Sequence, residues 1–298
     1  MPRFKINSGT PFVRRLAVSK RFEFSASHRL YNPQWSLEKN VAVYGNDSRG
    51  TYGHGHNFVV FFSFEGPVDP VTGMVVELSI IKEKINAELL IHYDHFYLND
   101  TPQFRETIPT VEAIAVALLS DAIGLFSTTP YTPISVHLIE TPTNSATAYR
   151  DGVAPFPGII RRDHHDTGTI ETRQDGRSFI EVHSPFSATH RLMSPTLSID
   201  ENRRCFGKCV RPHGHMFEVW ATFDHRTMTL DAANAHLNTV LGPWNYGDLN
   251  ELEEFKGQLV SVETIIRILW DKLAVTAPLV RLRLHETPNN RFSLRSSQ

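Results

Sequence analysis

The stretch FSASHRL, residues 24–30, recurs in the second half of the chain as FSATHRL, residues 186–192. Three more motifs follow each copy in the same order and at similar spacing: His-Gly-His, a Val-Glu pair preceded by Thr or Ser, and Glu-Thr-Pro. Their two copies lie at 54–56 and 213–215, at 109–112 and 260–263, and at 140–142 and 286–288. Because chance is a poor explanation for four ordered matches, we interpret the chain as two fused copies of one domain.

The length agrees with this interpretation, since 298 residues correspond to two domains of roughly 100 to 200 residues each. The predicted boundaries are 15–150 for the first domain, 151–177 for a linker and 178–298 for the second domain. The linker prediction rests on a polar, charged composition with Gly and Pro near its start. His164 and His165 lie in this stretch and are interpreted as surface histidines rather than metal ligands.

The predicted secondary structure has the same order in both halves: two strands, two helices and a closing strand. Strand-forming runs predict strands at 16–28, 56–64, 134–140, 179–190, 215–223 and 280–286. Apolar residues at helical spacing predict helices at 77–91, 110–125, 232–241 and 262–273. This order indicates an α+β fold, with an antiparallel sheet in each domain and helices packed on one face.

Composition and charge exclude several classes of partner. The formal net charge is -2, which argues against broad binding of nucleic acid or of an acidic membrane surface. No segment has the apolar length of a membrane span, and the N-terminus does not have the pattern of a signal peptide. The two cysteines, Cys205 and Cys209, do not form a disulfide framework. We therefore expect a cytoplasmic protein.

The His-Gly-His motif at 54–56 begins a predicted strand, so its two imidazoles project from the same face and can reach one ion. His28, near the end of the preceding strand, is the candidate third ligand. Three nitrogen ligands on zinc leave a fourth position open, as in catalytic sites. A single such motif is more often a surface or core feature, but this set persists in two copies that have otherwise diverged. The second copy consists of His190, His213 and His215.

These motifs, taken in order, resemble the 6-pyruvoyltetrahydropterin synthase and 6-carboxytetrahydropterin synthase family. Its marks are a first-strand His, a Cys shortly before His-Gly-His, an Asp-His pair before Leu-Asn, a Pro-Thr-x-Glu helix start and a late Glu-Thr. The resemblance covers nearly the whole chain outside the ends and the linker. It implies two tandem tunnel-fold (T-fold) domains, a homo-oligomer built from rings of domains, Zn²⁺ held by three histidines, and a substrate such as 7,8-dihydroneopterin triphosphate.

The family uses a thiolate to move protons on the substrate side chain, and the resemblance assigns that role to Cys209. This residue lies four positions before His-Gly-His in the second half. The corresponding loop of the first half, 44–53, has no cysteine. Matching its Tyr-Gly step places Asp47 near the position of the missing thiol, whereas counting back from His-Gly-His favours Ser48 or Gly50.

The family also uses an Asp-His pair as acid and base, and the resemblance assigns it to Asp94 and His95. Matched on Leu-Asn, the second half has Asn245 and Tyr246 instead. Each half thus lacks what the other retains. Because neighbouring domains of the family share an active site, we expect one composite site in which Cys209 meets the acid–base pair beside the second-half zinc.

Glu140 and Glu286 are the candidates for the pterin anchor that the family implies, because a carboxylate can accept two parallel hydrogen bonds from the ring. Thr110 is a candidate ring contact, with helix capping as an equally good explanation. The motifs do not distinguish a 6-carboxy from a 6-pyruvoyl product. Side-chain cleavage to a hydroxymethyl pterin and a non-catalytic pterin- or purine-binding protein on a decayed scaffold are the alternatives.

Overall fold

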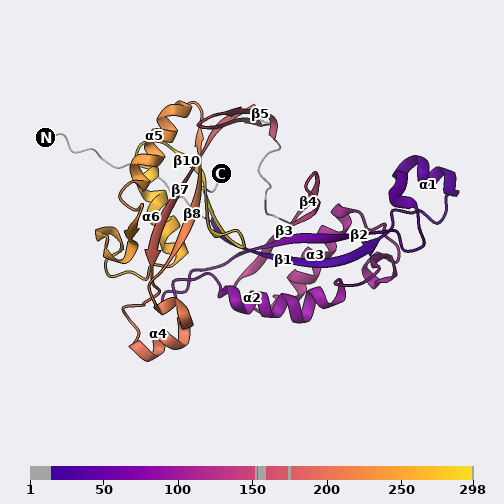
Figure 1. The fold of residues 1–298 in the computed structure, drawn as a ribbon, viewed down its shortest axis with the longest axis horizontal. Helices are drawn as coiled ribbons and strands as arrows, with labels where there is room; N and C mark the ends of the chain where they lie inside the picture. Colours follow the sequence, from indigo (N-terminus) through magenta and orange to yellow (C-terminus); the bar gives the residue numbers. More distant parts are fainter. Residues whose placement is uncertain (1–14, 152, 154–158, 174–175, 297–298) are drawn as a thin grey trace. The chain divides into compact units, whose positions relative to one another are not determined.

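The computed structural model describes residues 15–151, 153, 159–173 and 176–296 (Figure 1). The chain divides into two compact units. Among the described residues, the N-terminal unit comprises 17–151, 153 and 285–291, and the C-terminal unit comprises 15–16, 159–173, 176–284 and 292–296. Each unit combines an antiparallel sheet with helices, as an α+β fold requires.

The sheet of the N-terminal unit has the strand order β4-β3-β2-β1 and is antiparallel throughout. Alternate residues of its second strand are fully buried, from Phe58 to Phe64, because they face the helices. The longest helix, α3, packs against β3 and β4. The bounds are β1 Arg15–His28, α1 Leu37–Tyr44, β2 His54–Glu65, α2 Leu78–Lys84, α3 Val111–Leu125, β3 Thr132–Thr141 and β4 Asn144–Tyr149.

The C-terminal unit repeats this plan, with α5 beside β7 and α6 beside α5. Its strands follow the order β11-β10-β8-β7-β6-β5, and the short β9 pairs with β7 in parallel. The bounds are β5 Ile159–His165, β6 Gly168–Arg173, β7 Ser178–His190, α4 Ile199–Phe206, β8 His213–Asp224, α5 Leu230–Leu241, β9 Gly247–Asp248, α6 Val262–Leu273, β10 Leu279–Thr287 and β11 Asn290–Arg295.

The predicted strands and helices are all present, with ends that differ by a few residues. The second half of the predicted helix at 77–91 departs from α-helical geometry. It continues as a wider π-helical turn at Ile85–Leu89 and then as a tighter 3₁₀ turn at Leu90–His92. No helix in the described part of the chain is both long and apolar enough to cross a bilayer.

The stretch predicted as a linker contains the β5–β6 hairpin, which pairs with β7. Its polar composition is misleading, because Glu171 and Arg173 are each only 1% exposed. The Arg173 guanidinium lies 4.0 Å from the ring centroid of Phe179. Charged residues thus form part of the packing. His164 is exposed, as predicted, and the side chain of His165 lies outside the described residues.

A buried asparagine shapes the same loop in both units. The Asn40 amide donates to the carbonyl oxygens of Asn32 and Ser36 at 2.9 and 3.0 Å. The Asn202 amide donates to Ser194 and Ser198 at 3.1 and 3.0 Å. The sequence comparison did not single out this pair. The two asparagines fix the start of α1, which leads to Asp47, and of α4, which leads to Cys209.

Candidate metal centres and active site

Three histidines converge at one end of the sheet in the N-terminal unit. His28 ends β1 and lies opposite His54, and His56 lies opposite Ala26 in the same ladder. The ring centroids are 4.6 Å apart for His28 and His54, 5.3 Å for His28 and His56, and 4.9 Å for His54 and His56. Antiparallel pairing therefore places the three predicted ligands on one face.

The C-terminal unit has the same cluster. His190 lies opposite His213, and the three centroid distances are 4.6, 5.4 and 5.2 Å. All ligand atoms within each group are less than 4.8 Å apart. Both predicted histidine sets are thus brought together.

Backbone carbonyls orient the buried histidine of each cluster. His28 Nδ1 lies 2.7 Å from the Pro109 carbonyl oxygen, and His190 Nδ1 lies 2.9 Å from that of Val260. Because a carbonyl can only accept, Nδ1 carries the hydrogen and Nε2 presents its lone pair to the cluster. This arrangement is typical of metal-binding histidines.

The residues of the first cluster fit a metal ion that prefers imidazole, such as zinc. His56 Nε2 is buried and forms no hydrogen bond within the described part of the chain. Leaving a buried polar atom unsatisfied costs about 1–3 kcal/mol, which a metal bond would offset. Burial lowers the pKa of both His54 and His56, and this favours the neutral, metal-binding form.

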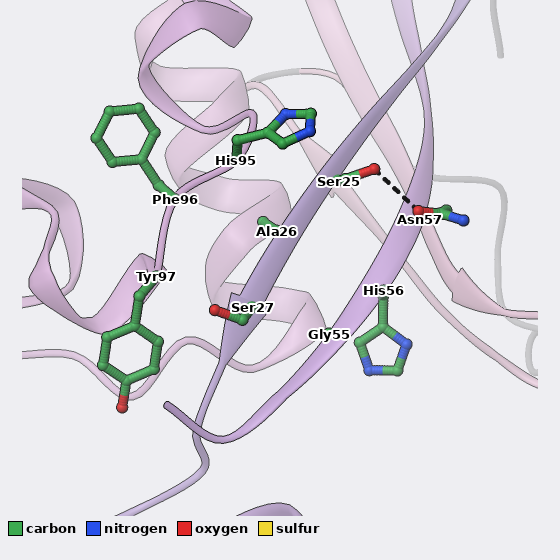
Figure 2. Close-up of a pocket in the computed structure, with 9 residues that line it drawn as sticks. All are labelled: Ser25, Ala26, Ser27, Gly55, His56, Asn57, His95, Phe96 and Tyr97. Atoms are coloured by element: carbon green, nitrogen blue, oxygen red, sulfur yellow. Dashed lines mark hydrogen bonds between the residues drawn. The ribbon is translucent and has the colours of Figure 1, made fainter. Parts of the chain in front are cut away.

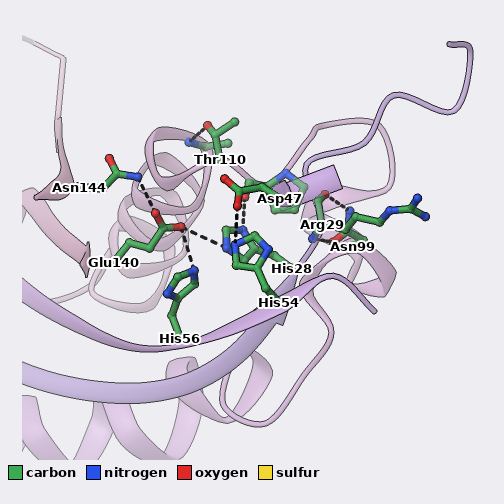
Figure 3. Close-up of polar contacts among 11 residues, drawn as sticks. His28, Arg29, Asp47, His54, His56, Asn99, Thr110, Glu140 and Asn144 are labelled. Carbon is green, nitrogen blue, oxygen red and sulfur yellow. Dashed lines mark hydrogen bonds and ion pairs between the residues drawn. The ribbon is translucent and has the colours of Figure 1, made fainter. Parts of the chain in front are cut away.

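Glu140, predicted as a pterin anchor, lies within the first cluster (Figure 3). Its Oε1 is 3.1 Å from His28 Nε2 and 3.7 Å from His56 Nε2. The Asn144 side chain donates to its other oxygen. Contact with His28 lowers the pKa of Glu140, so the carboxylate is ionised at neutral pH. Sequence comparison did not reveal this proximity to the histidines.

The equivalent Glu286 has the same kind of partner, because Asn290 Nδ2 donates to its Oε2 at 3.1 Å. Thr110 caps α3, since its hydroxyl accepts from the Ala113 backbone N–H at 3.3 Å. Roles for Glu286 and Thr110 in binding a pterin remain predictions.

The strand β1 holds both members of the Asp94–His95 pair. Asp94 Oδ1 accepts a hydrogen bond from the Ser25 N–H at 2.8 Å, and the His95 N–H donates to the Ser25 carbonyl at 2.6 Å. The second carboxylate oxygen lies 3.0 Å from His95 Nδ1. The Ser25 N–H lowers the pKa of Asp94. The carboxylate is therefore ionised and able to orient a solvent-exposed imidazole.

Asn245 and Tyr246 occupy the same scaffold in the C-terminal unit. Asn245 Oδ1 accepts from the Ser187 N–H at 2.9 Å, and the Tyr246 N–H donates to the Ser187 carbonyl at 2.6 Å. This equivalence confirms the match made on Leu-Asn. The amide retains the structural hydrogen bond, while the negative charge and the imidazole are both absent.

The structure also identifies the first-half counterpart of Cys209. The Leu192 N–H donates to the Cys209 carbonyl at 2.8 Å, and the Leu30 N–H donates to the Asp47 carbonyl at 3.0 Å. Both acceptors are third in a short helical turn, at Gly207–Val210 and Gly45–Ser48. Asp47 therefore stands at the thiol position. Its Oδ1 lies 3.9 Å from His54 Nε2.

Counting back from His-Gly-His gave Ser48 or Gly50 because the first-half loop is longer. Five residues, 49–53, separate the helical turn from the motif, against two, 211–212, in the second half. The correct alignment matches the aromatic residue and the Gly at which each turn begins, Tyr44-Gly45 and Phe206-Gly207.

The model of the 6-pyruvoyl tetrahydropterin synthase family matches residues 17–151 and again residues 179–297. The chain belongs to this family. It contains two copies of the family's domain, as the internal repeats predict.

Relatives of this family include the 6-pyruvoyl tetrahydrobiopterin synthase of Poecilia reticulata, which is 39% identical over 134 residues, 44% of this chain and 90% of that protein. The 6-carboxy-5,6,7,8-tetrahydropterin synthase of a Synechocystis strain is 29% identical over 144 residues, 47% of this chain and 97% of that protein. The solved 6-pyruvoyl tetrahydropterin synthase of Caenorhabditis elegans is 30% identical, with a TM-score of 0.41, and covers 46% of this chain and 96% of that one. Membership in the 6-pyruvoyl tetrahydropterin synthase family indicates a lyase that acts on pterins.

Within this family domain, a pocket of about 410 Å³ opens beside His95 in the N-terminal unit (Figure 2). His56 of the metal cluster lines it as well, together with Ser25 and Asn57, whose side chains are hydrogen-bonded at 2.9 Å. The pocket thus connects the predicted base to the edge of the predicted metal centre. At the position of Asn57 the second half has Met216, which is 58% exposed.

Proposed function

We propose that the protein is a zinc-dependent lyase that eliminates triphosphate from 7,8-dihydroneopterin triphosphate. The observation that carries the proposal is the contrast between backbone and side chains at the two catalytic positions. Both halves retain the hydrogen bonds that hold these positions, but each catalytic group occurs once. Cys209 is present only in the second half, and Asp94–His95 only in the first.

This pattern favours one composite active site. It comprises Cys209 and the second-half zinc centre, with the acid–base pair contributed by a first half in the assembled protein. Independent decay of two sites would not favour complementary losses. The proposal includes a homo-oligomer with rings of domains, because closure protects the edge strands of such sheets. It also places the protein in the cytoplasm.

The chemistry of these groups fits an elimination. Bound zinc would act as a Lewis acid that stabilises negative charge on a substrate oxygen. Cys209, as a thiolate near a cation, would remove a proton from a side-chain carbon. The electron pair released then expels triphosphate as the C–O bond breaks. His95, oriented by Asp94, would deliver or remove the proton needed at the neighbouring position.

The relatives bear on the product. The 6-pyruvoyl synthases are more similar to this chain than the 6-carboxy synthase is, and this supports 6-pyruvoyltetrahydropterin over 6-carboxytetrahydropterin. Incubation of zinc-loaded protein with the triphosphate, followed by phosphate analysis and product mass, tests the proposal and names the product. A metal-loaded protein that releases no triphosphate would overturn it.

A second candidate is cleavage of the substrate side chain to a hydroxymethyl pterin. Asp47 favours it, because this carboxylate stands where the thiol would be and lies near His54. The product mass in the same assay separates the two reactions. The protein would instead be a binding protein if the parent shows no turnover and Cys209→Ala binds the pterin with the same affinity as the parent.

A further inference from the structure

The geometry points to Glu140 as the fourth ligand of the first-half metal ion, which makes this centre closed and structural. This inference rests on the proposed function only in assigning catalysis to the other centre. It differs from a pterin-anchoring role, which would require the carboxylate to be available to the substrate. Three observations within the N-terminal unit support it.

The first observation is distance. Zinc bonds to nitrogen and oxygen are about 2.0–2.2 Å long, so neighbouring ligand atoms of a tetrahedral site are about 3.3–3.6 Å apart. Glu140 Oε1 lies 3.1 Å from His28 Nε2 and 3.7 Å from His56 Nε2. All four residues place a ligand atom within 4.8 Å of the others. The carboxylate oxygen therefore lies where a fourth tetrahedral ligand belongs.

The second observation is the support of the carboxylate. The Glu140 side chain is only 10% exposed. The Asn144 amide binds its Oε2 and leaves Oε1 directed at the histidines, as Figure 3 shows. A largely buried carboxylate facing three neutral imidazoles is costly without a cation. A divalent metal at this point supplies the missing positive charge, and Asn144 orients the ligand.

The third observation excludes the other nearby acid. Asp47 Oδ1 lies 3.9 Å from His54 Nε2, and its side chain is 54% exposed. It is farther away and better hydrated than Glu140. A metal with three imidazoles and Glu140 has no open position for a substrate oxygen, which agrees with the absence of the thiol from this half.

Zinc release tests the inference without any turnover. In a chain carrying His213→Ala and His215→Ala, only the first centre remains, and a chelator in excess reports its release rate. We expect Glu140→Gln to release zinc at least about tenfold faster, and Asn144→Ala to fall between it and the parent. Asp47→Asn is the matched control and should change the rate less than about twofold. An unchanged rate for Glu140→Gln overturns the inference.

Cobalt provides a test that needs no substitution at Glu140. In the same single-centre chain loaded with Co²⁺, a closed site should show no change in its visible spectrum on addition of azide. A spectral change in this parent shows an open position and overturns the inference, even if the Glu140 variants fail to fold. Because neither readout depends on the lyase reaction, failure of the proposed function leaves this result intact.

Discussion

His95 and Tyr246 adopt the same left-handed backbone conformation, with φ of +63° and +60°. Each donates its N–H to the carbonyl of a serine in the first strand of its own unit, at 2.6 Å. In a residue other than glycine, this conformation has a free-energy cost on the order of 1–3 kcal/mol, and it persists only where the surrounding contacts stabilise it. The backbone that holds the Asp94–His95 pair has thus been retained in the half that lacks the pair.

Cys209→Ala and His95→Ala should each lower turnover by about 100-fold or more, because each removes a group to which we assign a proton transfer. Cys205→Ala is the control for loss of a thiol and should leave turnover unchanged. Steady-state triphosphate release measures the effect. Full activity in either of the first two variants contradicts the composite site.

Mixed oligomers show which chains supply the two groups. If Cys209 and His95 of one site come from different chains, co-refolded Cys209→Ala and His95→Ala chains should regain about a quarter of the normal activity, because random assembly leaves that fraction of sites intact. If both come from one chain, the mixture stays inactive. Partner exchange is monitored in parallel with a labelled chain.

Asp94→Asn should preserve the fold, because the amide oxygen can accept a hydrogen bond from the Ser25 N–H as Asn245 accepts one from the Ser187 N–H. It should lower turnover by about 100-fold, because the carboxylate that orients His95 is lost. Asn245→Asp is the matched control and should leave activity and stability nearly unchanged. Circular dichroism and turnover measure the two properties. Loss of folded structure in Asp94→Asn would show that the charge itself holds the loop.

The stability of the parent should depend on pH through Asp94. Its pKa is lowered in the folded state by the Ser25 N–H, so the ionised form contributes stability above the unfolded pKa, about 3.9. That contribution is lost as the pH falls through the folded pKa. The difference in melting temperature between the parent and Asp94→Asn should therefore shrink below about pH 4. A difference in melting temperature that grows as the pH falls would have the opposite pH dependence and would refute the prediction.

The two metal centres should respond differently to loss of a ligand. His213→Ala should remove one metal per chain and abolish turnover, since it disables the centre that we propose to be catalytic. His54→Ala should also remove one metal, but it should act mainly on the melting temperature and lower the turnover of the folded fraction far less. Elemental analysis, thermal melts and turnover of the same samples make the comparison. Equal loss of turnover in both variants would assign catalysis to both centres.

Gly53→Ala should disrupt the first metal centre. Gly53 has φ of +66°, and an added Cβ would lie 1.9 Å from the His28 carbonyl oxygen, a contact that requires the backbone to move. Gly45→Ala is the matched control, because Gly45 has φ of +62° and no atom within 4 Å of the added Cβ. We expect the control to lose only about 1 kcal/mol of unfolding free energy and Gly53→Ala at least about 3 kcal/mol more. Similar losses would show that the loop relaxes freely.

Much of the fold and of the candidate site follows from the sequence, because both depend on local periodicity. The spacing of His54 and His56 on a strand sufficed to place them together, and the repeat supplied His28. The proximity of Glu140 to these histidines could not be predicted, since it depends on the register between β2 and β3. The β5–β6 hairpin was missed because Glu171 and Arg173 are charged yet buried, a property that composition does not reveal.

The hydrogen bonds around Asp47, Asn245 and Tyr246 determine how the lost side chains can be restored to each half. At each of these positions the main chain already has the conformation of the other copy, so the difference there lies in three side chains. Asp47→Cys, Asn245→Asp and Tyr246→His together would therefore give each half all three groups without a change of backbone at these positions. The asymmetry at these three positions is thus a property of side-chain identity, because the backbone there is the same in both halves.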